Sequence, residues 1–181
     1  MAGKNPGEAR QNFVGPLQQA LSCVTQAVLI TVKSAHDPTL EVLTLSSGSA
    51  RIGRDRPFTL GVDLQYRIIE FEDSRGPFKV STVGYAYTLF EVAPDHEVPI
   101  LAYHWHPHGR SQITYPHLHI YQCAEIRRPD GREAHFPTGR IAFEEILRLV
   151  IQEFNVRPIR EDWETILDRT KAAFEKWRTW P

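Results

Sequence analysis

The chain has 181 residues with a hydrophobic share of 41%, including nine Phe and four Trp, which is enough for one domain with an extensive apolar core. A formal net charge of −1 argues against a protein that binds nucleic acid through overall charge alone. Two cysteines do not make a disulfide framework, and no apolar run is long enough to serve as a signal peptide core or to span a bilayer. These features predict a cytoplasmic protein with no membrane segment.

The first part of the chain is expected to contain one helix. Residues 1–12 are polar and unpatterned, which predicts a disordered lead, and residues 13–181 are expected to form a single domain. Gly15 and Pro16 then open a predicted helix, because proline suits the first turn. Its apolar stripe consists of Leu17, Leu21, Val24 and Val28. A strand is expected at about residues 40–45, followed by a polar loop over residues 46–56.

The middle of the chain predicts antiparallel strands, and its end predicts two helices. Short turns that contain Pro, Gly and Asp favour hairpins over parallel crossovers. The expected strands are residues 65–71, 78–92, 98–106, 115–124 and 132–136. Apolar residues at helical spacing follow over residues 143–154 and 163–177. The predicted fold class is therefore α+β: an antiparallel sheet of about five to six strands, with an N-terminal helix and two C-terminal helices packed on one face.

The most informative feature is a group of five histidines within sixteen residues: His104, His106, His108, His117 and His119. Four of them form two His-x-His pairs, and alternate side chains of a strand point to one face. If the two strands are antiparallel neighbours, four imidazoles meet on one patch, while the bulky residues between them face the helices.

Three interpretations of this patch remain open. The imidazoles can act as general acid and base on a phosphodiester, with Arg110 or Arg140 stabilising the negative charge. They can instead bind Zn²⁺ or another divalent metal, whose water attacks a substrate. In the third interpretation they are ordinary strand histidines with hydrogen-bonded rings.

Several further residues are candidates around this patch. Glu125 shares strand parity with His117 and His119, so it is a candidate metal ligand together with His104, His106, His117 and His119. His135 joins the patch only if a bulge or a longer turn brings it round. Tyr85 and Tyr87 share one strand face and are candidates for stacking a base, with packing as the alternative. Arg140, near the start of a helix, is a candidate for binding an anion, and Cys123 is a candidate ligand or a small buried residue.

Two resemblances to known families add expectations. His117-x-His119 with Glu125 and Gly131 resembles the first metal motif of cupin barrels. The order of Tyr85-Ala-Tyr87, then Tyr-His-Trp-His-Pro-His over residues 103–108, then Pro116-His117-Leu118-His119 and a helix after Pro137 resembles the TumE-like family over residues 78–155. That family is assigned as toxins of toxin–antitoxin pairs. The resemblance implies a toxin or defence role and marks His108, His117 and His119 as functional positions.

The leading hypothesis is a toxin-like protein acting on RNA or nucleotides, of the ribonuclease or phosphodiesterase type. His117 and His119 would be the acid–base pair, His104 and His106 their partners, and Arg110 the anion contact, with no cofactor required. The alternative is a non-catalytic protein whose histidines bind a structural metal such as Zn²⁺ or line a partner interface. The exposed face of a terminal helix is the expected surface for an antitoxin or for a homodimer.

Overall fold

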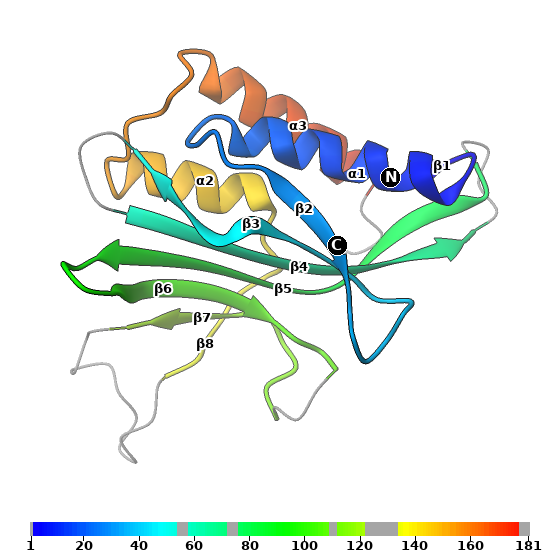
Figure 1. Ribbon diagram of the computed structural model, residues 1–181, viewed down its shortest axis with the longest axis horizontal. Helices are drawn as coiled ribbons and strands as arrows, with labels where there is room; N and C mark the ends of the chain where they lie inside the picture. Colours follow the sequence, from blue (N-terminus) through cyan, green and yellow to red (C-terminus); the bar gives the residue numbers. More distant parts are fainter. Residues whose placement is uncertain (1, 54–57, 72–75, 109–111, 122–133, 178–181) are drawn as a thin grey trace.

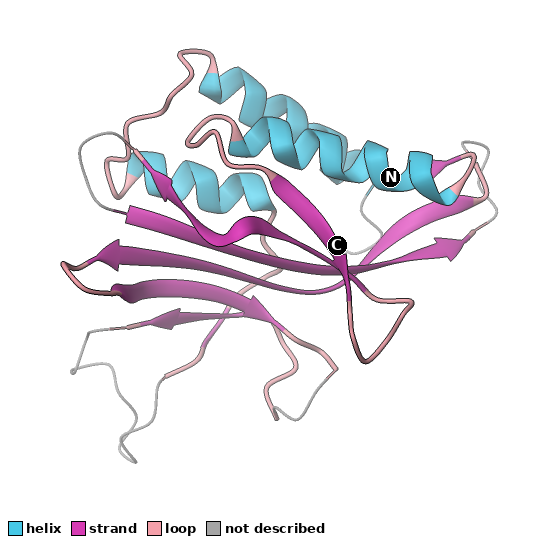
Figure 2. Ribbon diagram, in the orientation of Figure 1, coloured by secondary structure: helices cyan, strands magenta, loops and turns pink. Residues whose placement is uncertain are grey.

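The computed structural model describes residues 2–53, 58–71, 76–108, 112–121 and 134–177. Within these residues, the chain forms a sheet of eight strands and three helices, and its paired strands run antiparallel. The fold is α+β, as the sequence predicts, although the strands outnumber the five to six that were expected. The helices lie together on one face of the sheet (Figure 1 and Figure 2).

Strands that follow one another in the chain lie next to one another in the sheet, in the order β2-β3-β4-β5-β6-β7-β8, and β1 pairs with β5. This order reflects short connections, because a hairpin needs only a tight turn between antiparallel strands. The elements are β1 (Ala2–Gly3), α1 (Pro6–Leu21), β2 (Leu29–Lys33), β3 (Glu41–Ile52), β4 (Phe58–Glu70), β5 (Phe78–Val92), β6 (Glu97–Trp105), β7 (His117–Ile120), β8 (Phe136–Pro137), α2 (Phe143–Gln152) and α3 (Trp163–Trp177).

The N-terminal residues differ from the disordered lead expected over residues 1–12, because α1 already begins at Pro6. Asn5 caps the helix: its side chain accepts a hydrogen bond of 2.9 Å from the backbone N–H of Glu8. Proline at the first helical position and an acidic residue in the first turn complete a recognised start signal. Ala9, within residues 1–12 and on the same helix, is fully buried, so tertiary packing stabilises a segment that composition alone suggested was unstructured.

The segment after α1 also differs from the prediction, in which the apolar stripe of the helix continued to Val28. The helix ends at Leu21, and Leu29–Lys33 is strand β2. Branched side chains such as Ile30 and Val32 favour a strand over a helix. The expected loop over residues 46–56 is partly strand as well, since β3 continues to Ile52 through a bulge.

The core lies between the helices and the sheet. Helix α2 buries an apolar face, as the spacing of apolar residues in the sequence predicted. The buried residues of this face are Phe143, Ile146, Leu147, Val150 and Ile151. Because the helices cover one face only, the side chains of β6 and β7 that alternate with the core residues point to the opposite face. That face carries the histidines.

Candidate functional site

Strands β6 and β7 are antiparallel neighbours, as the alternation of histidines predicted. Their register places His104 opposite His117 and Ala102 opposite His119. Residues directly opposite across an antiparallel pair lie on the same face. The two His-x-His pairs therefore project from the sheet on one side, while Trp105 points to the helices and packs against Tyr85.

The imidazole rings are in mutual contact. The ring centroids are 4.7 Å apart for His104 and His119, 4.9 Å for His117 and His119, and 5.8 Å for His104 and His117. Each of these three residues offers one ring nitrogen, and the three nitrogens lie within 4.8 Å of one another. His106 extends the group, with its ring centroid 5.6 Å from that of His104.

A fifth histidine, His135, enters the group from the segment that leads into β8. Its ring centroid is 4.5 Å from that of His119 and 5.0 Å from that of His117. The sequence left open whether His135 lies on the apolar face or on the face of the histidines, and in the structure it lies with the histidines. We call His104, His106, His117, His119 and His135 the histidine cluster.

Hydrogen bonds fix the orientation of the central rings. The Nδ1 atom of His117 lies 2.8 Å from the carbonyl oxygen of Tyr115. A carbonyl only accepts, so Nδ1 carries the proton of this hydrogen bond, and Nε2 is the ring nitrogen turned toward the other histidines. That Nε2 atom is 3.0 Å from Nε2 of His119. A second ring nitrogen anchored to a backbone carbonyl is the usual way in which proteins orient a metal-binding imidazole.

The surroundings of His104 and His106 disfavour positive charge on these two rings. Burial, followed by the charges of His119, His106, His117 and His135, lowers the pKa of His104 to about 4. Burial also lowers the pKa of His106, against the opposing effect of Asp63. At neutral pH His104 is therefore an uncharged imidazole with a lone pair, which is the state that binds a metal or accepts a proton.

Small residues make room for the rings. Ala86 and Ala102 lie beside the histidines in the register of β5, β6 and β7. A Cβ atom at Gly84 would lie 3.0 Å from the backbone oxygen of Trp105 and 3.6 Å from Nδ1 of His106. Glycine thus permits a close approach that a larger residue would obstruct.

Sequence reasoning did not single out Asp63 or Gly84. Asp63 alternates with the buried Val62 and Leu64 on β4. It lies across from Ala86, which itself lies across from His104. A polar residue within an alternating apolar strand was the available signal, but only the sheet order shows that it faces the cluster.

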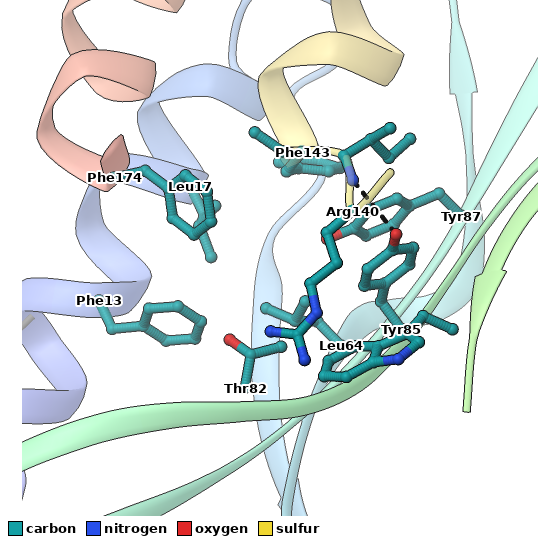
Figure 3. Close-up of a pocket in the computed structure, with 12 residues that line it drawn as sticks. Phe13, Leu17, Leu64, Thr82, Tyr85, Tyr87, Arg140, Phe143 and Phe174 are labelled. Atoms are coloured by element: carbon teal, nitrogen blue, oxygen red, sulfur yellow. Dashed lines mark hydrogen bonds between the residues drawn. The ribbon is translucent and has the colours of Figure 1, made fainter. Parts of the chain in front are cut away.

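Other candidates lie apart from the cluster. Tyr85 pairs with Trp105 and Tyr87 with Tyr103, so both tyrosines point to the helix side of the sheet. They stack on each other with ring centroids 4.9 Å apart, and both are buried. The sheet therefore lies between these tyrosines (Figure 3) and the histidine cluster, and their role in binding a substrate stays a prediction.

Arg140 is on the helix side as well. Its guanidinium carbon lies 3.4 Å from the ring centroid of Trp105. It is therefore not the anion contact of the histidine face that the sequence suggested. His108 is exposed in the bend after β6. Arg110, Cys123 and Glu125 lie outside the described residues.

Comparisons with protein-family models, with curated proteins and with solved structures found no match to this chain. None of the helices in the described part of the chain has the length and apolar character needed to cross a membrane. What the chain does must therefore be argued from the histidine cluster itself.

Proposed function

We propose that this protein is a metal-binding protein in which His104, His117 and His119 hold one divalent transition-metal ion of the zinc type. The observation that carries the proposal is the convergence of their three ring nitrogens within 4.8 Å of one another. Neutral imidazole is a favoured ligand of zinc, copper, nickel and iron. Hard cations such as magnesium prefer oxygen, and the proposed ligand set has none.

The separation of the His117 and His119 ring nitrogens suits a tetrahedral ion. Bonds of about 2.0–2.1 Å from metal to nitrogen place two ligand atoms roughly 3.3 Å apart at the tetrahedral angle. The two Nε2 atoms of His117 and His119 are 3.0 Å apart, so a shift of a few tenths of an ångström accommodates the ion. Both rings are buried, with exposed fractions of 5% and 7%, which removes competing water and strengthens coordination.

Three protein ligands leave one coordination position for water, which is the pattern of catalytic rather than structural zinc sites. His135 contacts two of the three ligand rings, and its imidazole could accept a proton from a water on the ion. A metal ion held by these three histidines would supply an activated water for the hydrolysis of an ester or phosphodiester. We infer hydrolysis as the reaction class, with RNA or nucleotides as the substrates that the TumE-like resemblance suggests.

Metal analysis tests the proposal directly. Protein purified without a histidine tag is dialysed, and its metal content is measured by plasma mass spectrometry. We expect one equivalent of a transition metal, lost in His117→Ala and His119→Ala. His96 lies in the exposed turn between β5 and β6, so His96→Ala is the matched control and should keep the metal. Equal metal content in all variants would refute the site.

Metal-free acid–base chemistry, the leading hypothesis from the sequence, is the second candidate. It is favoured by the 3.0 Å contact between His117 and His119, since one imidazole can donate to the other without an ion. A ribonuclease activity that survives complete chelation, yet is lost in His119→Ala, would support it over the metal-dependent reaction. Growth arrest on expression that is relieved by the same replacement would support the toxin role.

A further inference from the structure

The backbone of His135 is held differently from that of the three proposed metal ligands. Those ligands belong to β6 and β7, whose pairing fixes the direction of each ring. His135 lies in irregular backbone just before β8, which has only two residues and is the last strand of the sheet in the described part of the chain (Figure 1). Segments with few backbone hydrogen bonds move at low cost. The ring of His135 can therefore change position more easily than the rings of the ligands.

The spacing of the rings fits an ion that His135 also reaches. Bonds of about 2.0–2.1 Å from metal to nitrogen, with each ring centre roughly 1.1 Å farther out, place two imidazole centres roughly 5 Å apart on a tetrahedral ion. The ring centroids of the three proposed ligands are 4.7, 4.9 and 5.8 Å apart. The centroid of His135 is 4.5 Å from that of His119 and 5.0 Å from that of His117. His135 thus already has the separation of a further ligand from two of the three.

His106 does not have this position, although it belongs to the same cluster. Its ring centroid is 5.6 Å from that of His104, and within the described residues this is its one ring contact with the cluster. His106 therefore borders one proposed ligand, whereas His135 borders two. This difference makes His106 a matched control for His135.

A movement of His135 would change the coordination number of the ion. Among the described residues, the ring nitrogens that lie within 4.8 Å of one another belong to His104, His117 and His119, so His135 must move before it binds. Zinc with four protein ligands is closed to water, whereas three protein ligands leave one position open. A movable fourth imidazole therefore exchanges the ion between a closed and an open coordination sphere.

We propose that His135 is an exchangeable fourth ligand of the metal site. It closes the coordination sphere in the absence of substrate, and its bond to the ion breaks when a substrate or a small anion takes the same position. The inference rests on the proposed function, because it needs an ion at His104, His117 and His119. It adds regulation to that site, since the closed state retains the ion and excludes water from it.

The closed state has two measurable consequences of equal size. If His135 is bound in all but about a tenth of the molecules, it strengthens metal binding about tenfold and weakens the binding of a competing anion about tenfold. His135→Ala removes the closed state, so its affinity for cobalt(II) should fall and the affinity of its cobalt form for azide should rise by the same factor. Competition with a chelator measures the first affinity, and visible absorption during an azide titration measures the second.

A second variant shows directly whether residue 135 reaches the ion. Thiolate is a ligand of zinc-type ions, and a thiolate bound to cobalt(II) absorbs strongly in the near ultraviolet. His135→Cys should therefore add such a band to the spectrum of the cobalt-substituted protein. His106→Cys should add none, and His106→Ala should leave both affinities unchanged, because His106 borders a single ligand.

Circular dichroism first establishes that each variant is folded. Unchanged affinities in His135→Ala, with no added band in His135→Cys, would overturn the inference and leave the three-ligand site intact. A weaker affinity for cobalt without a stronger affinity for azide would refute the exchange. An equally strong band in His106→Cys would refute the assignment of His135. If the unchanged protein binds no cobalt, the metal site and the fourth ligand are both wrong.

Discussion

Acid unfolding of the metal-free protein tests the environment that the structure assigns to His104. Burial, reinforced by the neighbouring imidazoles, lowers its pKa from 6.5 to about 4. The unfolded chain has the ordinary pKa, so between these two values the unfolded state binds a proton that the folded state does not. Stability is therefore full above about pH 6.5 and is lost as the pH falls toward about 4. At 1.36 kcal/mol for each pKa unit, the loss amounts to about 3 kcal/mol.

The measurement is urea unfolding in the presence of a chelator, repeated at several pH values across this window, for the unchanged protein and for His104→Gln. Glutamine cannot titrate, so the variant should lose about 3 kcal/mol less stability than the unchanged protein on acidification. His96→Gln, in an exposed turn, should keep the full pH dependence. If His104→Gln shows the same decrease as the unchanged protein, the low pKa assigned to His104 is wrong.

Three further substitutions probe the core and the space around the cluster, and a fourth, in α1, serves as a control. Leu147→Ala in α2 should lower the free energy of unfolding by about 2–5 kcal/mol, measured in urea, because this side chain is fully buried. Burial raises the pKa of the Glu144 carboxyl, so the folded protein loses stability as the pH rises above the ordinary pKa of glutamate. Glutamine carries no charge at any pH, and Glu144→Gln should therefore raise the free energy of unfolding at neutral pH. Thermal unfolding at neutral and acid pH should show that this gain disappears in acid. Gly84→Ala should lower the free energy of unfolding by about 1–3 kcal/mol, because its Cβ would contact the backbone of β6. In α1, a Cβ at Gly15 meets nothing within 4 Å, so Gly15→Ala should raise the free energy of unfolding by about 0.5–1 kcal/mol. If Gly84→Ala lowers the affinity for metal and Gly15→Ala does not, the histidine cluster depends on the space beside Gly84.

Local periodicity in the sequence determined much of what the structure contains. The apolar spacing over residues 143–154 predicted the buried face of α2, and β5 has the predicted bounds, Phe78–Val92. The pairs His104/His106 and His117/His119 predicted a shared face because side-chain direction alternates within each strand regardless of the rest of the fold.

Only the tertiary structure decided which of these local faces coincide. Tyr85 and Tyr87 resemble the histidines in spacing, but the register of β5 with β6 directs them to the helix side. The path of the chain into β8 brings His135 to the cluster, and the burial of Ala9 accompanies helix in residues 6–12, where composition predicted disorder. Register, bulges and turn geometry join residues that are distant in sequence, and their energies depend on partners that no local pattern specifies.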